Sequence, residues 1–221
     1  MLIEIIADTI CPWCYIGKQR LKKAMAMRPA LDFELRWRPF QLNPTMPLGG
    51  IERDTYLMTR FGTLDRAERA QDRLRKAGRE DGLSFRFDRI RRIPNTVAAH
   101  RLLRHSEPYG LQEALVDALY DAYFSAGQDT GEIEALADIA ANIGLDRDEA
   151  ATFLDGIGHR AEILAEDEQV RQSGITGVPC FVIEDEFAVS GAQAPEVFVQ
   201  IFDLARQNEG EPPALRKAAA E

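Results

Sequence analysis

Basic residues, cysteines and long apolar runs are all scarce in this sequence of 221 residues. Asp and Glu total 36 against 27 Lys and Arg, and the net charge of -9 argues against a nucleic-acid-binding protein. No apolar run approaches the roughly 20 residues that a membrane-spanning helix needs. Three cysteines are too few for a disulfide framework, so the fold must depend on its hydrophobic core. We expect a soluble globular protein without nucleic-acid or membrane partners.

The N-terminus also lacks the features of a secretory signal. Such a signal has a basic start, an apolar segment of about 7–15 residues and a cleavage site with small residues. Here Met1 is followed directly by a predicted strand. We therefore expect a cytoplasmic protein, in a compartment that keeps thiols mostly reduced and favours a reductase or isomerase over a dedicated oxidant.

Two of the cysteines stand close together in the segment Cys11-Pro12-Trp13-Cys14, between an apolar run and a helical pattern. This context predicts a strand-to-helix turn with Cys11 at the N-cap and Pro12 at the first helical position. The Cys11 sulfur would then face unpaired backbone N–H groups and the positive end of the helix dipole. Such a setting lowers a cysteine pKa from about 8.5 to roughly 3.5–7.5. We expect Cys11 to be the nucleophile in thiol–disulfide exchange, and Cys14, one turn further on, to be shielded and to react second.

A zinc site and a purely structural pair are the alternatives for these two cysteines. Tetrahedral zinc takes four ligands, and the remaining cysteine and histidines show no second pair with ligand spacing. These residues are Cys180, His100, His105 and His159. A structural pair would not need Pro and Trp between its thiols at a strand–helix junction. The pattern favours redox chemistry, and we expect no bound metal.

Hydrophobic periodicity divides the chain into three parts. The first has predicted strands at 2–7 and 31–38 around a helix at 14–27, which indicates a right-handed βαβ unit with parallel strands. The periodicity places Lys18 on the polar face of this helix. The last has a predicted hairpin of strands 180–183 and 187–190. An amphipathic helix closes the chain.

The long middle part is helical, with no strand signal of similar strength. We predict helices at 56–61, 65–78, 97–105, 111–125, 132–143, 146–155 and 159–173. The helix at 65–78 is crowded with basic side chains, which we interpret as a solvated face. They are Arg66, Arg69, Arg73, Arg75 and Lys76.

Four landmarks in order carry a resemblance to a known family. They are the Cys11–Gly17 segment, Pro39-Phe40-Gln41-Leu42-Asn43-Pro44, Asn95-Thr96 with Ala99-His100-Arg101-Leu102, and Gly177-Val178-Pro179. The chain resembles DsbA-like thioredoxin-fold oxidoreductases over its whole length, most of all the FrnE-type group. The resemblance implies an α/β thioredoxin fold with a large all-helical insertion. Its parts would be a thioredoxin-fold domain at 1–48 and 175–208, an inserted helical domain at 49–174, and a flexible tail at 209–221.

The resemblance also implies roles for site residues. Cys11 would form a mixed disulfide that Cys14 resolves, and Pro12 and Trp13 would contact substrate and set the redox poise. Pro179 would be a cis-proline facing the dithiol, which leaves the backbone of Val178 free to pair with a substrate peptide. The alternative for Pro179 is an ordinary proline at a strand edge.

The sequence leaves two interpretations open for each of four further residues. Asp8 either tunes the dithiol or relays a proton, or it belongs to the turn. Cys180 is either a small buried hydrophobe or a third redox participant that faces Cys11. Asn95 and His100 either start a helix and fill the core or contribute to the site wall.

The sequence supports three functional hypotheses. The first is an oxidoreductase acting on protein or small-molecule disulfides, with no bound cofactor and with glutathione as a candidate thiol co-substrate. The second is a glutathione-dependent isomerase or transferase, since 2-hydroxychromene-2-carboxylate isomerases and kappa-class glutathione transferases are similar to parts of this chain. Those relatives have serine where Cys11 stands, which speaks against this hypothesis. The third is a holdase-like module that offers an apolar groove between the inserted helices.

Overall fold

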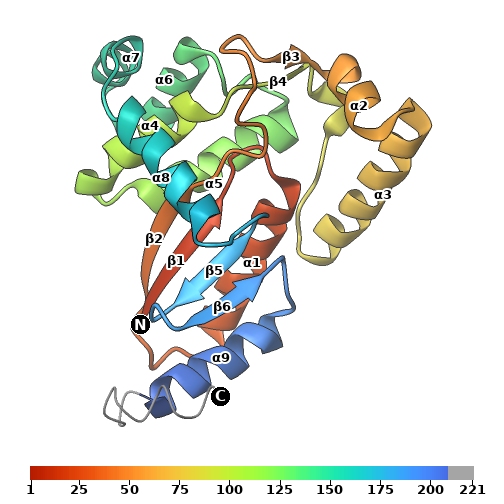
Figure 1. The fold of residues 1–221 in the computed structure, drawn as a ribbon. Coiled ribbons are helices and arrows are strands. Elements are labelled where there is room, and N and C mark those ends of the chain that lie inside the picture. The colour runs from red at the N-terminus through yellow and green to blue at the C-terminus, as the bar shows by residue number, and fades with distance from the viewer. Residues whose placement is uncertain (209–221) are drawn as a thin grey trace.

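The computed structural model describes residues 1–208, and the predicted tail at 209–221 lies outside the described residues. Its centre is a four-stranded sheet in the order β2-β1-β5-β6 (Figure 1). β1 (Leu2–Ala7) and β2 (Glu34–Pro39) are parallel, while β5 (Cys180–Ile183) is antiparallel to β1 and to β6 (Phe187–Ser190). The predicted βαβ unit and the predicted hairpin are confirmed, and they share one sheet.

The two faces of the sheet are covered by different helices. Because successive strand residues point to opposite faces, Ile5 and its partner Phe181 lie on one face, and Ile6 and its partner Cys180 lie on the other. The first face packs against α1 (Pro12–Ala26) and α9 (Pro195–Asn208), as the edge-to-face contact of the Phe181 and Phe198 rings shows. The second face packs near α8 (Arg160–Gln172), where Ile6 and Cys180 form an apolar cluster with Phe40 and Val170.

The segment between β2 and β5 is mainly helical, and in Figure 1 it lies above the sheet and, with α2 and α3, to its right. Its α-helices are α2 (Arg53–Phe61), α3 (Leu64–Glu80), α4 (Val97–Ser106), α5 (Gln112–Asp121), α6 (Ile133–Asn142), α7 (Arg147–Asp155) and α8 (Arg160–Gln172). Short 3-10 turns occupy Phe87–Arg89 and Glu107–Tyr109. All seven predicted helices are confirmed with small shifts in their ends. The division of the chain into two domains stays a prediction.

Two features of the helical segment differ from the prediction. A pair of two-residue strands, β3 (Ile51–Glu52) and β4 (Arg92–Ile93), joins its beginning to its middle. Strands this short leave no periodic signal in the sequence. In addition, the helix predicted at 111–125 changes after Asp121 into a π-helical turn at Ala122–Ala126. Both Tyr123 and Phe124, adjacent in that turn, are buried.

Lys18 corrects another part of the prediction. The helical pattern places it on the polar face of α1, but its side chain is only 3% exposed. Its Nζ lies 2.5 Å from a carboxylate oxygen of Glu113 and 2.7 Å from one of Asp117, both on α5. A buried ammonium group requires such partners, and these exist only because α5 packs against α1.

Arg101 stabilises the connection between α4 and the end of α7. Its guanidinium donates hydrogen bonds to four backbone carbonyls, those of Phe153 (2.9 Å), Leu154 (3.0 Å), Gly156 (2.7 Å) and Gly158 (2.6 Å). The residue is 4% exposed. An apolar replacement would leave these acceptors without their donor in a buried place.

We expect Arg101→Met to lower the free energy of unfolding by about 3 kcal/mol, since several buried acceptors lose a charged donor at once. Urea denaturation followed by far-UV circular dichroism measures this. The matched control is Arg147→Met, because the ion pairs of Arg147 lie at the surface and the loss should be much smaller. Equal losses in the two variants would contradict the role assigned to Arg101.

Candidate active site

The turn between β1 and α1 presents the two cysteines predicted to react. Cys11 is the N-cap residue of α1, with extended backbone angles (φ -89°, ψ 112°), and Pro12 is the first helical residue. The Cys11 carbonyl accepts hydrogen bonds from the N–H of Cys14 at 3.0 Å and of Tyr15 at 3.2 Å. The Cys11 side chain makes no capping hydrogen bond. As the side chain of the N-cap residue it lies at the helix end where backbone N–H groups lack intrahelical partners. The predicted N-cap position is confirmed.

Cys14 lies one turn into α1 in a different environment. Both thiols are buried, Cys11 at 3% and Cys14 at 2% exposure, but for Cys14 burial, a hydrogen bond with the Cys11 thiol and the charge of a Cys11 thiolate raise the pKa well above the ordinary value. Cys14 therefore keeps its proton near neutral pH. Cys11 lines the pocket that opens beside the helix, whereas Cys14 is not among the pocket's described lining residues. A substrate in that pocket meets the Cys11 sulfur.

The segment before β5 faces this turn from the other side. The Val178–Pro179 peptide bond is cis, as predicted, and the Cys11 Sγ lies 3.8 Å from the Val178 carbonyl oxygen. The Pro179 carbonyl accepts a hydrogen bond from Gly191 at 2.8 Å, which holds the segment to the end of β6. On α1, a Cβ at Gly17 would lie 3.0 Å from the Pro179 Cγ and 3.1 Å from the Phe181 ring. The absence of a side chain at Gly17 thus allows α1 to lie close to the cis-proline.

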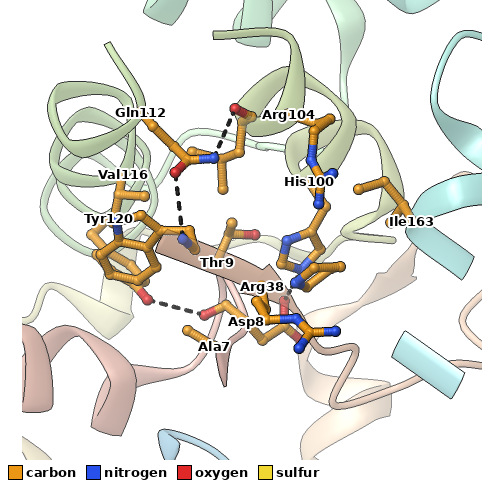
Figure 2. Close-up of a pocket in the computed structure, with 13 residues that line it drawn as sticks. Ala7, Asp8, Thr9, Arg38, His100, Arg104, Gln112, Val116, Tyr120 and Ile163 are labelled. Atoms are coloured by element: carbon orange, nitrogen blue, oxygen red, sulfur yellow. Dashed lines mark hydrogen bonds and ion pairs between the residues drawn. The ribbon is translucent and has the colours of Figure 1, made fainter. Parts of the chain in front are cut away.

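Asp8, which directly follows β1, and His100, on α4, lie close together (Figure 2). The Asp8 carboxylate is buried. Its Oδ2 accepts a hydrogen bond from the Leu42 N–H at 2.7 Å, and its Oδ1 lies 3.4 Å from the His100 Nε2, outside hydrogen-bond geometry. These two atoms and the Thr9 Oγ1 are buried without a hydrogen-bond partner among the described residues. Asp8, Thr9 and His100 also line a cavity of about 10 Å³, a volume that fits one water molecule. The Asp8 carboxylate thus joins the end of β1 to the segment after β2, and both interpretations of Asp8 stay predictions.

Tyr120 is a neighbour of the site that the sequence analysis missed. Its hydroxyl donates a hydrogen bond to the Asp8 carbonyl at 3.3 Å, and its ring stacks on that of Tyr15 with centroids 4.9 Å apart. Burial raises its pKa well above the ordinary value, and negative charge on Cys14 and Cys11 adds to this effect. The hydroxyl therefore stays protonated as a donor. No local pattern around Tyr120 indicates this contact, which depends on how α5 packs.

Asn95 and Cys180 are held away from the dithiol by their own contacts. The Asn95 side chain donates to the Met46 carbonyl at 2.7 Å and accepts from the Val97 N–H at 3.0 Å, so it shapes the turn that begins α4. Cys180 lies on the face of β5 opposite to Phe181, among apolar side chains, and burial raises the pKa of its thiol. These placements favour the helix-start role for Asn95 and the hydrophobic role for Cys180.

A pocket of about 430 Å³ opens beside Cys11. Pro12, Trp13 and Val178 line it together with Cys11, and the rest of its wall comes largely from α2, α3 and the turn at Phe87–Arg89. Trp13 is 41% exposed, which is unusual for so large an apolar side chain. Four of the predicted site residues therefore meet in one cavity.

Two features are absent from the described residues 1–208. No group of three or more His, Cys, Asp and Glu side chains there is arranged to hold a metal ion. No helix in that range combines the length and the apolar character that crossing a bilayer requires.

Comparison with known proteins adds to this geometry. A probable DsbA oxidoreductase from Streptomyces coelicolor is similar at a TM-score of 0.84 and 33% identity, over 96% of this chain and 92% of that one. A 2-hydroxychromene-2-carboxylate isomerase is similar at a TM-score of 0.72 and 16% identity, over 95% and 98%. The cytosolic disulfide reductase DsbM from Pseudomonas aeruginosa, solved with glutathione, is similar at 0.65 and 18%, over 94% and 100%. The family model of the DsbA-like thioredoxin domain matches residues 2–203, and this chain therefore belongs to the DsbA-like thioredoxin-domain family.

Proposed function

We propose that this protein is a thiol–disulfide oxidoreductase in which Cys11 attacks the substrate and Cys14 releases it. The observation that carries the proposal is the position of Cys11, at the N-terminus of α1, on the wall of a pocket and next to the Val178 carbonyl. Cys14 is buried one turn away and keeps its proton. This asymmetry separates an attacking sulfur from a resolving sulfur.

The proposed reduction proceeds in two exchanges. The Cys11 thiolate attacks one sulfur of a disulfide, a Cys11–substrate disulfide forms, and the first substrate thiolate leaves. The Cys14 thiol then gives up its proton and attacks the Cys11 sulfur, so that the Cys11–Cys14 disulfide forms and the second substrate thiolate leaves. One departing thiolate takes up the Cys14 proton, the other takes up from the solvent the proton that Cys11 released on ionisation, and two electrons pass to the substrate. A second thiol compound, such as glutathione, resets the dithiol by the reverse exchanges.

Val178 supports binding of the substrate next to the reacting sulfur. Its carbonyl lies 3.8 Å from the Cys11 Sγ, and the residue lines the same pocket as Pro12 and Trp13. A substrate whose sulfur reaches Cys11 therefore also meets the Val178 backbone, which offers hydrogen bonds to an extended segment.

Glutathione-dependent isomerisation or transfer is the second candidate. It draws on the fold shared with a 2-hydroxychromene-2-carboxylate isomerase and on the DsbM structure that contains glutathione. An enzyme of that kind would hold reduced glutathione and use its sulfur, whereas an oxidoreductase exchanges disulfides with it. The thiol at position 11, beside a second thiol at position 14, favours exchange.

Equilibration with mixtures of reduced and oxidised glutathione distinguishes the two functions. We expect Cys11 and Cys14 to be oxidised together in a single two-electron transition, because Cys11 lines the pocket and Cys14 is hydrogen-bonded to it from one turn away. Cys180 should stay reduced, because it lies in the apolar cluster on the other face of the sheet. Acid quenching, alkylation after unfolding and mass spectrometry count the thiols. Cys180→Ala is the matched control and should leave the midpoint unchanged. If all three thiols stay reduced while reduced glutathione binds without a mixed disulfide, the isomerase or transferase function is the better one.

A further inference from the structure

The pocket beside Cys11 has an unusual combination of charge and apolar surface. Its described lining residues include three arginines, Arg53, Arg60 and Arg73, and no Asp or Glu. The whole chain carries a net charge of -9. A pocket lined by arginines and by no Asp or Glu therefore has the opposite charge to the chain as a whole. Such a lining raises the local concentration of anions next to the Cys11 sulfur.

Two of these arginines have no partner of their own. Among the described residues, neither Arg60 nor Arg73 makes a side-chain hydrogen bond or an ion pair within 4.0 Å, and both are exposed. Arg75, on the same helix as Arg73, instead pairs with Glu68 at 2.8 Å and Asp72 at 2.7 Å. The guanidinium groups of Arg60 and Arg73 are thus available to an anionic ligand, which they can bind in a bidentate manner.

The third arginine is already fixed in place. Arg53 donates from Nη1 to Asp54 and from Nη2 to the Gln71 Oε1, at 3.0 Å each. Gln71 lines the pocket as well and is buried. Arg53 therefore contributes charge to the wall, and Arg60 and Arg73 are the residues that can rearrange around a ligand.

The remaining wall of the pocket is apolar and partly aromatic. The side chains that form it include Leu57, Leu74, Phe87, Ile90, Tyr123 and Phe124. The volume of about 430 Å³ lies in the range of roughly 300–1,000 Å³ that is typical of small-molecule sites. A standard protein–protein contact instead covers about 800 Å² on each partner, mostly over open surface. The pocket thus fits one small molecule with an apolar body and an acidic group.

We infer that the preferred substrate of Cys11 is a low-molecular-weight disulfide whose halves combine an apolar or aromatic body with an ionised acid group. The apolar body occupies the pocket, Arg60 and Arg73 bind the acid group, and the disulfide lies at Cys11 and Val178. This inference rests on the proposed function, and the exchange is balanced as described there, with the dithiol as the reductant.

The test uses two aromatic disulfides that differ in charge. 5,5′-dithiobis(2-nitrobenzoate) carries one carboxylate on each half, and 2,2′-dithiodipyridine is neutral. Each is mixed with the reduced protein in stopped flow, and the released thiol is followed by absorbance. The ratio of the two rate constants is compared with the same ratio for free glutathione, because the two reagents differ in intrinsic reactivity. We expect the protein to favour the carboxylate reagent about tenfold relative to the free thiol.

The double variant Arg60→Gln with Arg73→Gln should lose this preference and still react normally with 2,2′-dithiodipyridine. Far-UV circular dichroism and a thermal unfolding midpoint equal to that of the parent protein show that it folds. Arg66→Gln with Arg69→Gln is the matched control. It removes the same charge next to the pocket, and neither residue lines it. The control should keep the preference. An equal loss in both double variants, or no preference in the parent protein, would overturn the inference.

Two other outcomes separate this inference from neighbouring ones. If the parent protein reacts with neither reagent faster than free glutathione does, the proposed function itself fails. The second outcome is that the rate of insulin reduction by the Arg60 and Arg73 double variant falls about tenfold, as much as its rate with the carboxylate reagent falls. In that case the pocket binds a protein segment, and the assignment of a small-molecule substrate is wrong.

Discussion

Replacement of Cys11 by serine is expected to lower the rate constant for reduction of a small disulfide by roughly a thousandfold or more. A hydroxyl is a far weaker nucleophile than a thiolate at neutral pH. Cys14 cannot substitute for the missing sulfur, because burial and its neighbours keep it protonated. Single-turnover kinetics with glutathione disulfide, monitored by mass spectrometry of quenched samples, give this rate constant.

Cys180→Ala provides the control for the loss of a thiol. Cys180 lies in the apolar cluster on the other face of the sheet, and its removal should leave the rate constant within about twofold. A Cys11→Ser variant that keeps more than a tenth of the parent rate would show that another group attacks the substrate. The assignment of Cys11 as nucleophile would then be wrong.

Replacement of Cys14 by serine is expected to leave the attack by Cys11 intact and to trap the mixed disulfide. Cys11 can still attack, but the mixed disulfide has no neighbouring thiol to resolve it, so the complex should accumulate to about one per chain. In the parent protein the same species should decay within the turnover time. Non-reducing electrophoresis after an acid quench measures the accumulated complex, and the variant with both Cys11→Ser and Cys14→Ser is its control. Equal reduction rates in the parent protein and the Cys14→Ser variant would contradict a resolving role for Cys14.

Much of this site is encoded within short segments of sequence. The apolar run of β1, the Pro at the first position of α1 and the short strand segments of β5 and β6 around a turn are local signals, and the structure has these elements where the sequence predicts them. The cis peptide at Val178–Pro179 was expected from the family resemblance, and the structure confirms it. The position of Cys11 at a helix N-terminus follows from these segments alone.

Other parts of the site depend on contacts between distant segments. The helical pattern of α1 predicts that Lys18 is exposed. Only the packing of α5 against α1 buries its side chain beside Glu113 and Asp117. Tyr120 reaches the Asp8 carbonyl for the same reason. No periodicity predicts such contacts, since they depend on the angle and register between two helices.

The arginines of α3 show a third kind of difference between the sequence-based prediction and the structure. The sequence analysis interprets the basic residues of this helix as one solvated face, and Arg66, Arg69 and Arg73 are indeed exposed. The structure separates Arg73 from the others, because it alone of these three lines the pocket beside Cys11. Exposure to solvent and a place on a pocket wall are compatible, and sequence patterning does not distinguish them.

The most direct test of the account is to locate the sulfur that holds the trapped substrate. The Cys14→Ser variant is mixed with glutathione disulfide at neutral pH, quenched with acid, digested without reduction and analysed by tandem mass spectrometry. The account predicts a single glutathione per chain, attached to Cys11. Glutathione on Cys180, or binding of glutathione with no covalent adduct at all, would contradict the claim that a helix N-terminus and a pocket make Cys11 the attacking thiol.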